Sequence, residues 1–341
     1  MVTQQQIARK LGVSRQLVAF ALAGYPQVSQ ASRQRILAAA QVMGYRPNPH
    51  ARALRRQRTG IIALFIPDQI STHNSRVARE LNRLVRRERQ ELIISEMDAA
   101  EARQTLSNVP VDGVIAVDIP GQAKVYRQIL AARAIPLVSM GASCAGETDA
   151  VRVDLKAGAS QVMAHLLDAG YRRIAHATFM HDDHGDQPEA GRWQGYQEAM
   201  RKAGLKPEFI YYPLTKQLRP VTRQFIQDYI RQHGRPEAIF CHSDDAAIGV
   251  YRGLCDLKLR VPQDVALAGC DGIEDTEYLE CPLTTLVQPV EEMCAAAWKF
   301  LTDRLAHPEQ KKQSMVLQPK LEIRQSSSRG GDGATTRMVA A

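Results

Sequence analysis

The sequence predicts an α/β protein with a small helical head at its amino end and a two-lobed body built on parallel sheets. Three observations predict this fold class. Positive charge is concentrated at the amino end, the first 45 residues contain three short helical patterns, and from Gly60 onward short β-branched runs alternate with helical stretches. The chain has 341 residues, enough for two to three domains at about 100–200 residues each.

The net charge of +8 is unevenly distributed. Residues 1–67 contain ten Lys or Arg and no acid, which leaves 34 basic and 36 acidic residues, a charge of −2, in residues 68–341. A basic head on a nearly neutral body is typical of a nucleic-acid-binding segment. A solvated basic face or a targeting segment would give the same count.

Composition and motifs exclude several other classes. The longest apolar run, residues 61–67, is far shorter than the roughly 18 residues of a membrane span, and residues 1–9 lack a signal-peptide core. The six cysteines form no CxxC pair, which favours free thiols. Nucleotide-binding, hydrolase and zinc-protease motifs are absent, so we expect no enzyme activity and no cofactor. The run 181–186 has two histidines among carboxylates, but a solvated loop is favoured over a metal site.

The first helical pattern begins at Thr3, which forms a capping box with Gln6 and predicts a helix ending at Gly12. Ser14 is a suitable N-cap for a second helix over residues 15–23. A helix, a tight turn containing glycine and a second helix have the spacing of a helix-turn-helix.

A third helix follows the second after a short turn. Ser29 is its predicted N-cap, and the helical pattern continues to about Met43. Ile36, Leu37 and Ala40 have the spacing to close a small core against the first two helices.

The second helix of a helix-turn-helix enters the major groove with its first residues toward the bases. Here these residues are Arg15 and Gln16. Arg can donate two hydrogen bonds to guanine and Gln can pair with adenine, each worth ~1–3 kcal/mol of discrimination. Two exposed polar residues on a surface helix are the alternative, but the basic context favours base contact.

Residues 45–56 are a different kind of segment. Two prolines interrupt any preceding helix, and the following turn places Leu54 among Arg52, Arg55 and Arg56. The segment is too short and too charged to form a stable helix alone. It can fold when phosphates neutralise the arginines, with Leu54 inserted between base steps of the minor groove. A flexible linker is the alternative.

The body pattern predicts parallel sheets with helices on both faces, because strands and helices alternate over about 260 residues. Two such lobes would enclose a ligand cleft at the carboxyl ends of their strands. The predicted strands are 61–66, 91–95, 111–117, 135–139, 150–154, 172–178, 238–241 and 265–269, with helices including 75–90, 156–169 and 244–258.

Motifs along the whole chain resemble the LacI/GalR family of transcription regulators. In the head these are Ile7-Ala8, Leu11–Ser14, Val28–Arg33, Gly44–Asn48 and Ala51–Arg55, and in the body Val111–Ile115, Ile135–Val138, Gly170–Ile174, Val261–Val265 and Pro282–Gln288. The resemblance implies a homodimer on pseudo-palindromic operator DNA, with paired hinge helices that insert Leu54 into the minor groove. It also implies a body similar to periplasmic sugar-binding proteins.

The predicted DNA-contacting residues lie in the head and the hinge. They are Thr3, Ser14, Arg15, Gln16, Phe20, Ser29, Arg33, Arg52, Leu54, Arg55 and Arg56. At 17–20 the chain has Leu-Val-Ala-Phe where the family usually has Thr-Val-Ser-Arg. Phe20 thus replaces a DNA-contacting cation, and it either meets a thymine methyl or only packs.

The predicted effector-binding residues lie in the body. Those at strand ends that match family contacts are Asp68, Arg192, Asp244, Asp271 and Gln288, and His73 and Arg76 come from the loop after the first strand. Arg192 is the foremost candidate, and Asp271 suits vicinal hydroxyls, whereas Asp244 can instead cap its own helix. Residues 71–76 lack the usual aromatic platform, and Arg76 beside Arg192 would suit an acidic group. The predicted effector is a sugar or a sugar acid.

These features predict four segments: a helix-turn-helix domain at 1–45, a hinge at 46–59, an effector-binding and dimerisation domain at 60–325, and a disordered tail at 326–341. The predicted function is a sequence-specific repressor, cytoplasmic and associated with the nucleoid, without a membrane partner. A solute-binding protein and a nonspecific architectural DNA binder are the alternatives.

Overall fold

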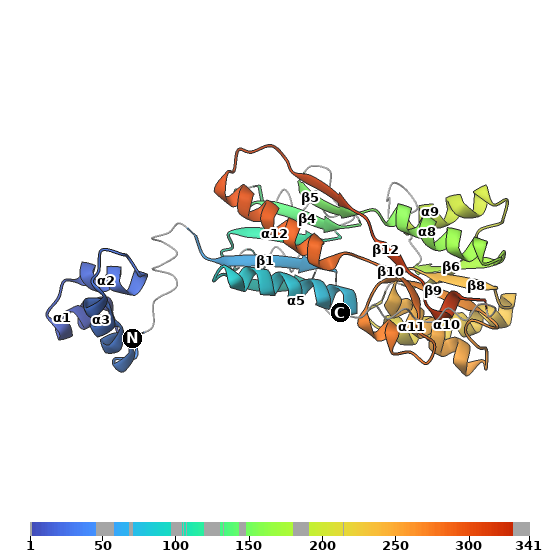
Figure 1. The fold of residues 1–341 in the computed structure, drawn as a ribbon, viewed down its shortest axis with the longest axis horizontal. Helices are drawn as coiled ribbons and strands as arrows, with labels where there is room; N and C mark the ends of the chain where they lie inside the picture. Colours follow the sequence, from blue (N-terminus) through green and yellow to red (C-terminus); the bar gives the residue numbers. More distant parts are fainter. Residues whose placement is uncertain are drawn as a thin grey trace, which may run out of the picture. The chain divides into compact units, whose positions relative to one another are not determined.

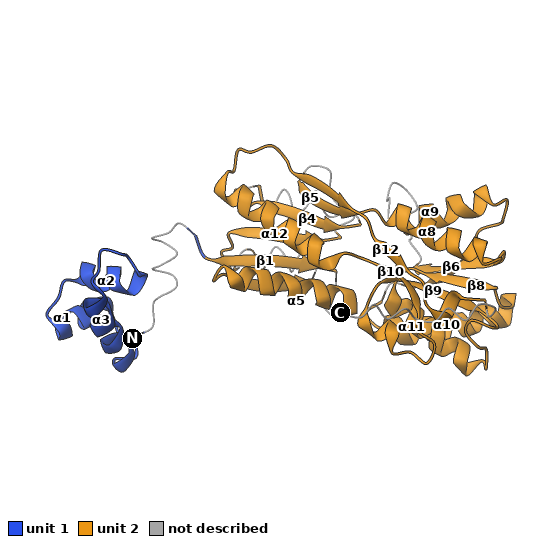
Figure 2. Cartoon of the chain, viewed as in Figure 1, with its two compact units in different colours: residues 1–59 blue, residues 60–341 orange. Residues whose placement is uncertain are grey.

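The computed structural model describes most of the chain. The described residues are 2–45, 58–67, 71–96, 104, 106, 108–118, 130–131, 133–142, 148–179, 191–213 and 215–329. The chain divides into two compact units, Met1–Thr59, called the head here, and Gly60–Ala341, called the body (Figure 2).

The head contains three helices with the predicted starts. They are α1 (Gln4–Leu11), α2 (Arg15–Ala23) and α3 (Gln30–Val42). The capping box between Thr3 and Gln6 is formed, and Gly12 ends α1 in the left-handed conformation with φ 67°. Ser14 caps α2 by accepting a hydrogen bond from the Leu17 amide at 3.1 Å, and Ser29 caps α3. The local capping signals therefore determine the head's helix starts.

The head core is formed by buried side chains from all three helices. Ile7 of α1 and Val18 of α2 are fully buried, and Ile36 of α3 is almost so. The prediction that Leu37 also closes this core is wrong, because its side chain is 45% exposed. Residues one position apart on a helix differ by about 100°, so burying Ile36 turns Leu37 toward solvent.

The body contains two six-stranded sheets, one in each lobe (Figure 1). The lobe 1 sheet has the order β11-β5-β4-β3-β1-β2 and is parallel throughout. The lobe 2 sheet has the order β12-β10-β9-β8-β6-β7, with only β12 antiparallel. The strands are β1 (Ile61–Ile66), β2 (Glu91–Glu96), β3 (Gly113–Val117), β4 (Leu137–Gly141), β5 (Asp149–Val153), β6 (Ile174–Phe179), β7 (Glu208–Tyr212), β8 (Ala238–Cys241), β9 (Ala266–Asp271), β10 (Thr284–Val287), β11 (Ser314–Leu317) and β12 (Lys320–Glu322).

Helices cover both sheets and carry the chain between the lobes. They are α5 (Thr72–Arg87), α8 (Leu155–Asp168), α9 (Gly191–Lys202), α10 (Leu218–His233), α11 (Asp244–Asp256) and α12 (Val290–Ala306), with 3₁₀ turns at η1 (Glu274–Glu277) and η2 (Gln325–Ser327). The chain passes from β5 to α8 in lobe 2, returns from β10 to α12 in lobe 1, and crosses again from β11 to β12 (Figure 1).

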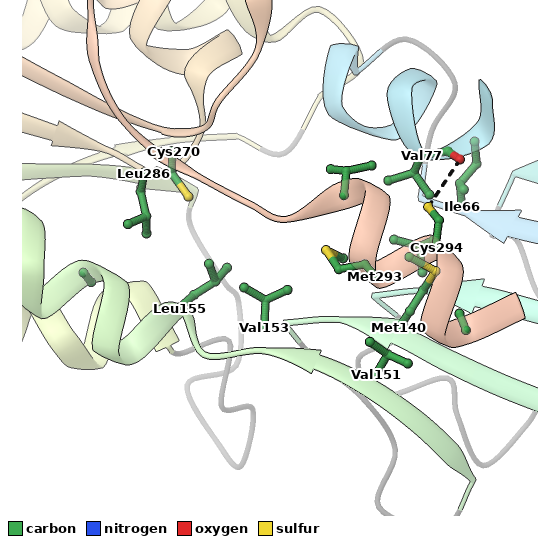
Figure 3. Close-up of a cluster of buried hydrophobic side chains, with 14 of the residues drawn as sticks. Ile66, Val77, Met140, Val151, Val153, Leu155, Cys270, Leu286, Met293 and Cys294 are labelled. Carbon is green, nitrogen blue, oxygen red and sulfur yellow. Dashed lines mark hydrogen bonds between the residues drawn. The ribbon is translucent and has the colours of Figure 1, made fainter. Parts of the chain in front are cut away.

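Helix α12 packs against α5 and against strands β3, β4 and β5 of the lobe 1 sheet, while α5 packs on β1 and β2. Figure 3 shows Met293 and Cys294 of α12 close to Val77 of α5 and Met140 of β4, all buried. The Cys294 thiol donates to the Val77 carbonyl at 3.8 Å. The C-terminal part of the chain thus completes the core of the first lobe, which explains why both lobes belong to one compact unit.

The parallel-sheet prediction is confirmed, but several elements differ from it. Four strands were not predicted: β7, β10, β11 and β12. The last two are short and exposed, so they carry no alternation of buried and exposed residues. The tail does not begin at residue 326, because Ser326 and Ser327 are fully buried. The Ser326 hydroxyl donates to the Leu267 carbonyl at 2.6 Å and accepts from the Thr284 amide at 2.8 Å.

Among the described residues, no helix has the length and apolar character needed to cross a membrane. Five cysteines in this part of the chain are free thiols: Cys241, Cys255, Cys270, Cys281 and Cys294.

Candidate functional site

The head presents one helix with two unengaged polar side chains. Arg15 and Gln16, in the first turn of α2, are exposed, and their side chains form no hydrogen bond with the described residues. Val18 and Ala21 anchor the opposite face of α2 in the core. Both polar side chains are therefore free to contact another molecule.

Phe20 lies one turn after Gln16 on the same helix. Its ring is half-buried and packs against Tyr25, with ring centroids 5.1 Å apart and planes at 57°. Tyr25 itself is 49% exposed. The two rings form an apolar patch at the carboxyl end of α2.

Other head candidates are engaged within the head. The hydroxyls of Thr3, Ser14 and Ser29 cap the three helices, although all three residues are exposed. The Arg33 guanidinium donates to the Tyr25 carbonyl and so fastens the turn between α2 and α3. The predicted hinge residues Arg52, Leu54, Arg55 and Arg56 lie outside the described residues.

In the body, polar side chains from both lobes meet around Arg192, the second residue of α9. Its Nη2 donates to His242 Nε2 at 2.8 Å, and its Nη1 donates to the Cys270 thiol at 3.6 Å. Because a guanidinium only donates, His242 Nε2 must be the acceptor and the His242 ring proton sits on Nδ1. Burial acts to lower the pKa of Arg192, but the neighbouring Cys270 thiol and the charges of Asp271 and Asp118 hold that pKa above its usual range. We call the residues His73, Asp118, Arg192, Tyr212, His242 and Asp271 the inter-lobe cluster.

Two aspartates of this cluster lie at strand ends in opposite lobes, and both have a positive φ. Asp118 directly follows β3 in lobe 1 with φ 41°, and Asp271 ends β9 in lobe 2 with φ 131°. Such values are rare for residues with a side chain and are concentrated at functional sites. The Asp271 carboxylate accepts from Gln288 Nε2 at 2.8 Å. Burial raises the pKa of Asp271 to about 7, although Arg192 and Gln288 act to lower it.

Asp244 is buried beside this cluster but is engaged by the protein. Its carboxylate accepts from the amides of Gly272 and Ile273 at 2.7 and 2.9 Å and from the Thr285 hydroxyl at 2.7 Å. Burial and the Asp271 charge raise the pKa of Asp244 to about 7. The prediction that Asp244 caps its helix is wrong, because Ser243 is the N-cap of α11. Asp244 instead holds the loop that follows Asp271.

Three buried polar atoms of the inter-lobe cluster have no hydrogen-bond partner among the described residues. They are His73 Nδ1, Arg192 Nε and the Tyr212 hydroxyl oxygen. Burial lowers the pKa of His73 to about 4 and raises that of Tyr212, so both side chains are neutral near pH 7. A buried polar group without a partner costs about 1–3 kcal/mol. Three together point to a ligand between the lobes that supplies the missing partners.

The lobes touch each other beside this cluster. The amide and hydroxyl of Thr72, at the start of α5, donate to the Asp245 carboxylate of α11 at 3.1 and 3.2 Å. Arg76 Nη1 donates to the Gly272 carbonyl at 3.2 Å, and its Nη2 pairs with Glu291 at 2.9 Å. The Arg76 guanidinium is thus engaged, which removes the reason for expecting an acidic ligand. Asp68, the remaining effector candidate, lies outside the described residues.

Asp118, Tyr212 and His242 were not predicted as members of the cluster. Asp118 was detectable, because it follows an apolar strand in the same way as Asp271. Tyr212 and His242 also come at or directly after strand ends. A polar residue directly after a predicted strand is the signal for Asp118 and His242, whereas Tyr212 carries no such signal because β7 was not predicted.

Other features of the body do not contribute to this cluster. Hollows of about 600 and 500 Å³ lie elsewhere, the first beside Tyr251 and Cys281 and the second beside Asp149 and Arg304. Within the described part of the chain, no group of three or more His, Cys, Asp or Glu side chains could hold a metal ion. The run 181–186 lies outside it.

Comparisons with known proteins match both units. Residues 3–48 match the model of bacterial regulatory proteins of the lacI family, and residues 163–327 match a periplasmic binding protein-like domain. The ribose operon repressor of Haemophilus influenzae is 29% identical over 345 residues, covering 96% of this chain and 98% of that protein.

Solved structures show the same fold. The lac repressor dimer bound to operator and the anti-inducer ONPF has a TM-score of 0.82 at 19% identity, covering 96% of this chain and 99% of that one. A LacI family regulator from Enterococcus faecium with bound ribose has a TM-score of 0.70 at 23% identity, covering 79% and 98%.

A helix-turn-helix head joined to a two-lobed binding-protein-like body defines a transcriptional regulator whose DNA binding responds to a small molecule. The chain belongs to the LacI/GalR family of bacterial transcriptional regulators.

Proposed function

We propose that the chain is a repressor that binds a pseudo-palindromic operator as a homodimer. A neutral polyhydroxyl effector raises or lowers its affinity for that operator. The observation that carries the effector part is the set of three buried, unpartnered polar atoms in the inter-lobe cluster. An operator partner also favours the cytoplasm and the nucleoid as the location, and no enzyme activity or cofactor is required.

In the head, Arg15 and Gln16 are the base-contacting residues of this proposal, because they are exposed and unengaged at the start of the second helix. Thr3, Ser14, Ser29 and Arg33 lie at helix ends and at the α2–α3 turn, where helix amides and a guanidinium suit phosphates. The hinge arginines and Leu54 complete the proposed DNA surface.

In the body, Arg192, Asp271 and His73 are the proposed effector contacts. Asp271 accepts from ligand hydroxyls, while Arg192 Nε donates to a ligand oxygen. Acidic groups are well represented here, because Asp118 belongs to the cluster and Asp245 lies near it, while Arg76 is engaged by Glu291. A neutral ligand with several hydroxyls fits this balance better than a sugar acid.

The homodimer is proposed from the likeness to the lac repressor, whose solved structure is a dimer bound to operator. Light scattering coupled to gel filtration measures the mass in solution, and a monomer would contradict the proposal.

The DNA-binding part is tested by selecting operator sequences from a random duplex library with the full-length protein. We expect a specificity ratio of roughly 10³ or more over random DNA, retained as salt reduces both affinities. The double variant Arg15→Ala/Gln16→Ala should bind the operator no more tightly than random DNA, while its affinity for random DNA should stay unchanged. A ratio near one would favour an architectural binder, and no DNA binding at all would favour a solute-binding protein.

The effector part is tested by a thermal-shift screen of neutral sugars, polyols, sugar acids and nucleobases. We expect a neutral polyhydroxyl compound to raise the melting temperature and change operator affinity. Arg192→Ala should abolish both responses, whereas Arg260→Ala, at an exposed site in lobe 2, should leave them unchanged. A response restricted to sugar acids would contradict the proposed ligand class.

A further inference from the structure

The solvent-facing side of α2 changes character along its length. Its amino end carries the exposed polar side chains of Arg15 and Gln16. After Gln16 the helix continues Leu-Val-Ala-Phe-Ala-Leu-Ala, with no side chain that can donate or accept a conventional hydrogen bond. Residues four positions apart share a helix face, so Phe20 continues the face of Gln16, whereas Ala19 is buried at 7% exposure.

The aromatic end of this face is held in place by the following turn. Gly24 ends α2 at φ 80°, and the Tyr25 amide donates to the Phe20 carbonyl at 3.1 Å. The Tyr25 carbonyl accepts from the Val28 amide at 3.3 Å and from Arg33. Tyr25 is therefore fixed against the Phe20 ring while remaining 49% exposed.

The core behind α2 leaves Phe20 partly outside. Val18 and Ala21 are buried at 0% and 2% exposure and occupy the core side of the helix. A phenyl ring left partly exposed beside base-contacting side chains costs hydration free energy unless a partner covers it. In the major groove, the apolar group that an A·T base pair presents is the 5-methyl of thymine.

We infer that Phe20, supported by Tyr25, recognises a thymine 5-methyl group in each operator half-site, next to the bases contacted by Arg15 and Gln16. The inference rests on the proposed DNA-binding function and deepens it. Phe20 is the contacting residue, and Tyr25 is a positioning residue that keeps the Phe20 ring at the helix surface.

The test replaces thymine by deoxyuridine, one position at a time, in the selected operator. Deoxyuridine keeps every hydrogen-bonding group and removes only the methyl. We expect about a fourfold loss of affinity at one or two positions per half-site, the fold-change corresponding to about 0.8 kcal/mol per buried methyl group. Affinity for operators substituted outside the half-sites should not change.

Variants assign the effect to particular side chains. Phe20→Ala should bind thymine and uracil operators equally, and Tyr25→Ala should reduce the fourfold ratio. Arg15→Ala should weaken binding to both operators and keep the ratio. Since Phe20→Ala can also destabilise the head, a second measurement uses 5-iodouracil at the sensitive positions of the wild-type complex. Photocrosslinking to Phe20 or Tyr25 supports the inference.

Two results would overturn it. If the operators with thymine and with uracil bind equally well at every position, no methyl group is contacted and the inference is wrong. Specific binding would then be intact, so the proposed function would stand. A photocrosslink from 5-iodouracil to an element other than α2 and its following turn would also contradict the inference. If selection yields no specific operator, the proposed function fails, and the inference fails with it.

Discussion

Asp271 combines three properties that rarely occur in one residue. It has φ 131°, it is 5% exposed, and its carboxylate accepts from Gln288 while lying close to Arg192. The sequence identified Asp271 and Arg192 as partners in one site, and both belong to the inter-lobe cluster. Burial, which no local pattern reports, is what raises the pKa of Asp271 to about 7.

This pKa predicts that effector affinity depends on pH. Ligand hydroxyls need the ionised carboxylate as acceptor, and that form predominates above pH 7. We expect the effector to bind about tenfold more tightly at pH 8 than at pH 6, because the ionised fraction rises from about one tenth to about nine tenths. Isothermal titration calorimetry at both values measures the change.

Neighbouring groups provide the controls for this pH dependence. Asp118, Asp244, Asp245 and Arg192 all face Asp271 or its neighbours, and Asp244 also has a pKa near 7. Asp271→Asn should weaken binding and flatten the profile, whereas Asp244→Asn should retain a slope from Asp271. A profile that stays steep in Asp271→Asn would assign the titration to another group.

At the scale of elements, the α10–α11 pair depends on glycine at its contact. A Cβ added at Gly249 would collide with the Thr222 hydroxyl and the Arg219 carbonyl, both on α10. A Cβ added at Gly253 would collide with Ile226 and the Arg223 carbonyl. The two helices can therefore approach only because α11 has glycine at these two positions, one turn apart.

Gly249→Ala should destabilise the body by about 1–3 kcal/mol, because the helices must separate to admit the methyl group. The loss should occur even though alanine is the better helix former by about 1 kcal/mol. Urea unfolding followed by circular dichroism measures it. Cys255→Ala, on the exposed side of the same helix, is the matched control and should change stability by less than about 0.5 kcal/mol. If Gly249→Ala and the wild type have equal free energies of unfolding, the two helices can move apart without cost and the prediction is wrong.

At the scale of the whole body, a small polar contact joins the lobes. Asp245 accepts from the Thr72 amide and hydroxyl across the lobe boundary and from Arg219 Nε at 2.8 Å within lobe 2. Arg219 also pairs with Asp275 at 2.6 Å. Thr72 and Asp245 directly precede and follow the candidate residues His73 and Asp244, so lobe closure and effector contact involve the same chain segments.

Asp245→Ala should shift the lobes toward an open arrangement. Loss of charge-assisted hydrogen bonds worth about 1.5–3 kcal/mol corresponds to roughly ten- to hundredfold weaker closure. Small-angle scattering with and without effector should therefore show less compaction than in the wild type. Asp275→Ala removes only a surface ion pair and should compact normally. Compaction of Asp245→Ala at wild-type effector concentrations would contradict a role for this contact.

The sequence by itself determined the helix starts of the head and the alternation of strands and helices in the body. These features follow from short-range effects, since a cap hydrogen bond or an apolar period involves residues only a few positions apart. Only the tertiary structure decided which face of α3 is buried, that Ser326 and Ser327 belong to the body, and that Asp244 supports a loop. It also decided that Asp118, Tyr212 and His242 join Arg192 between the lobes. Those outcomes depend on burial and on partners tens of residues apart along the chain, and such free energies are fixed only when the elements pack.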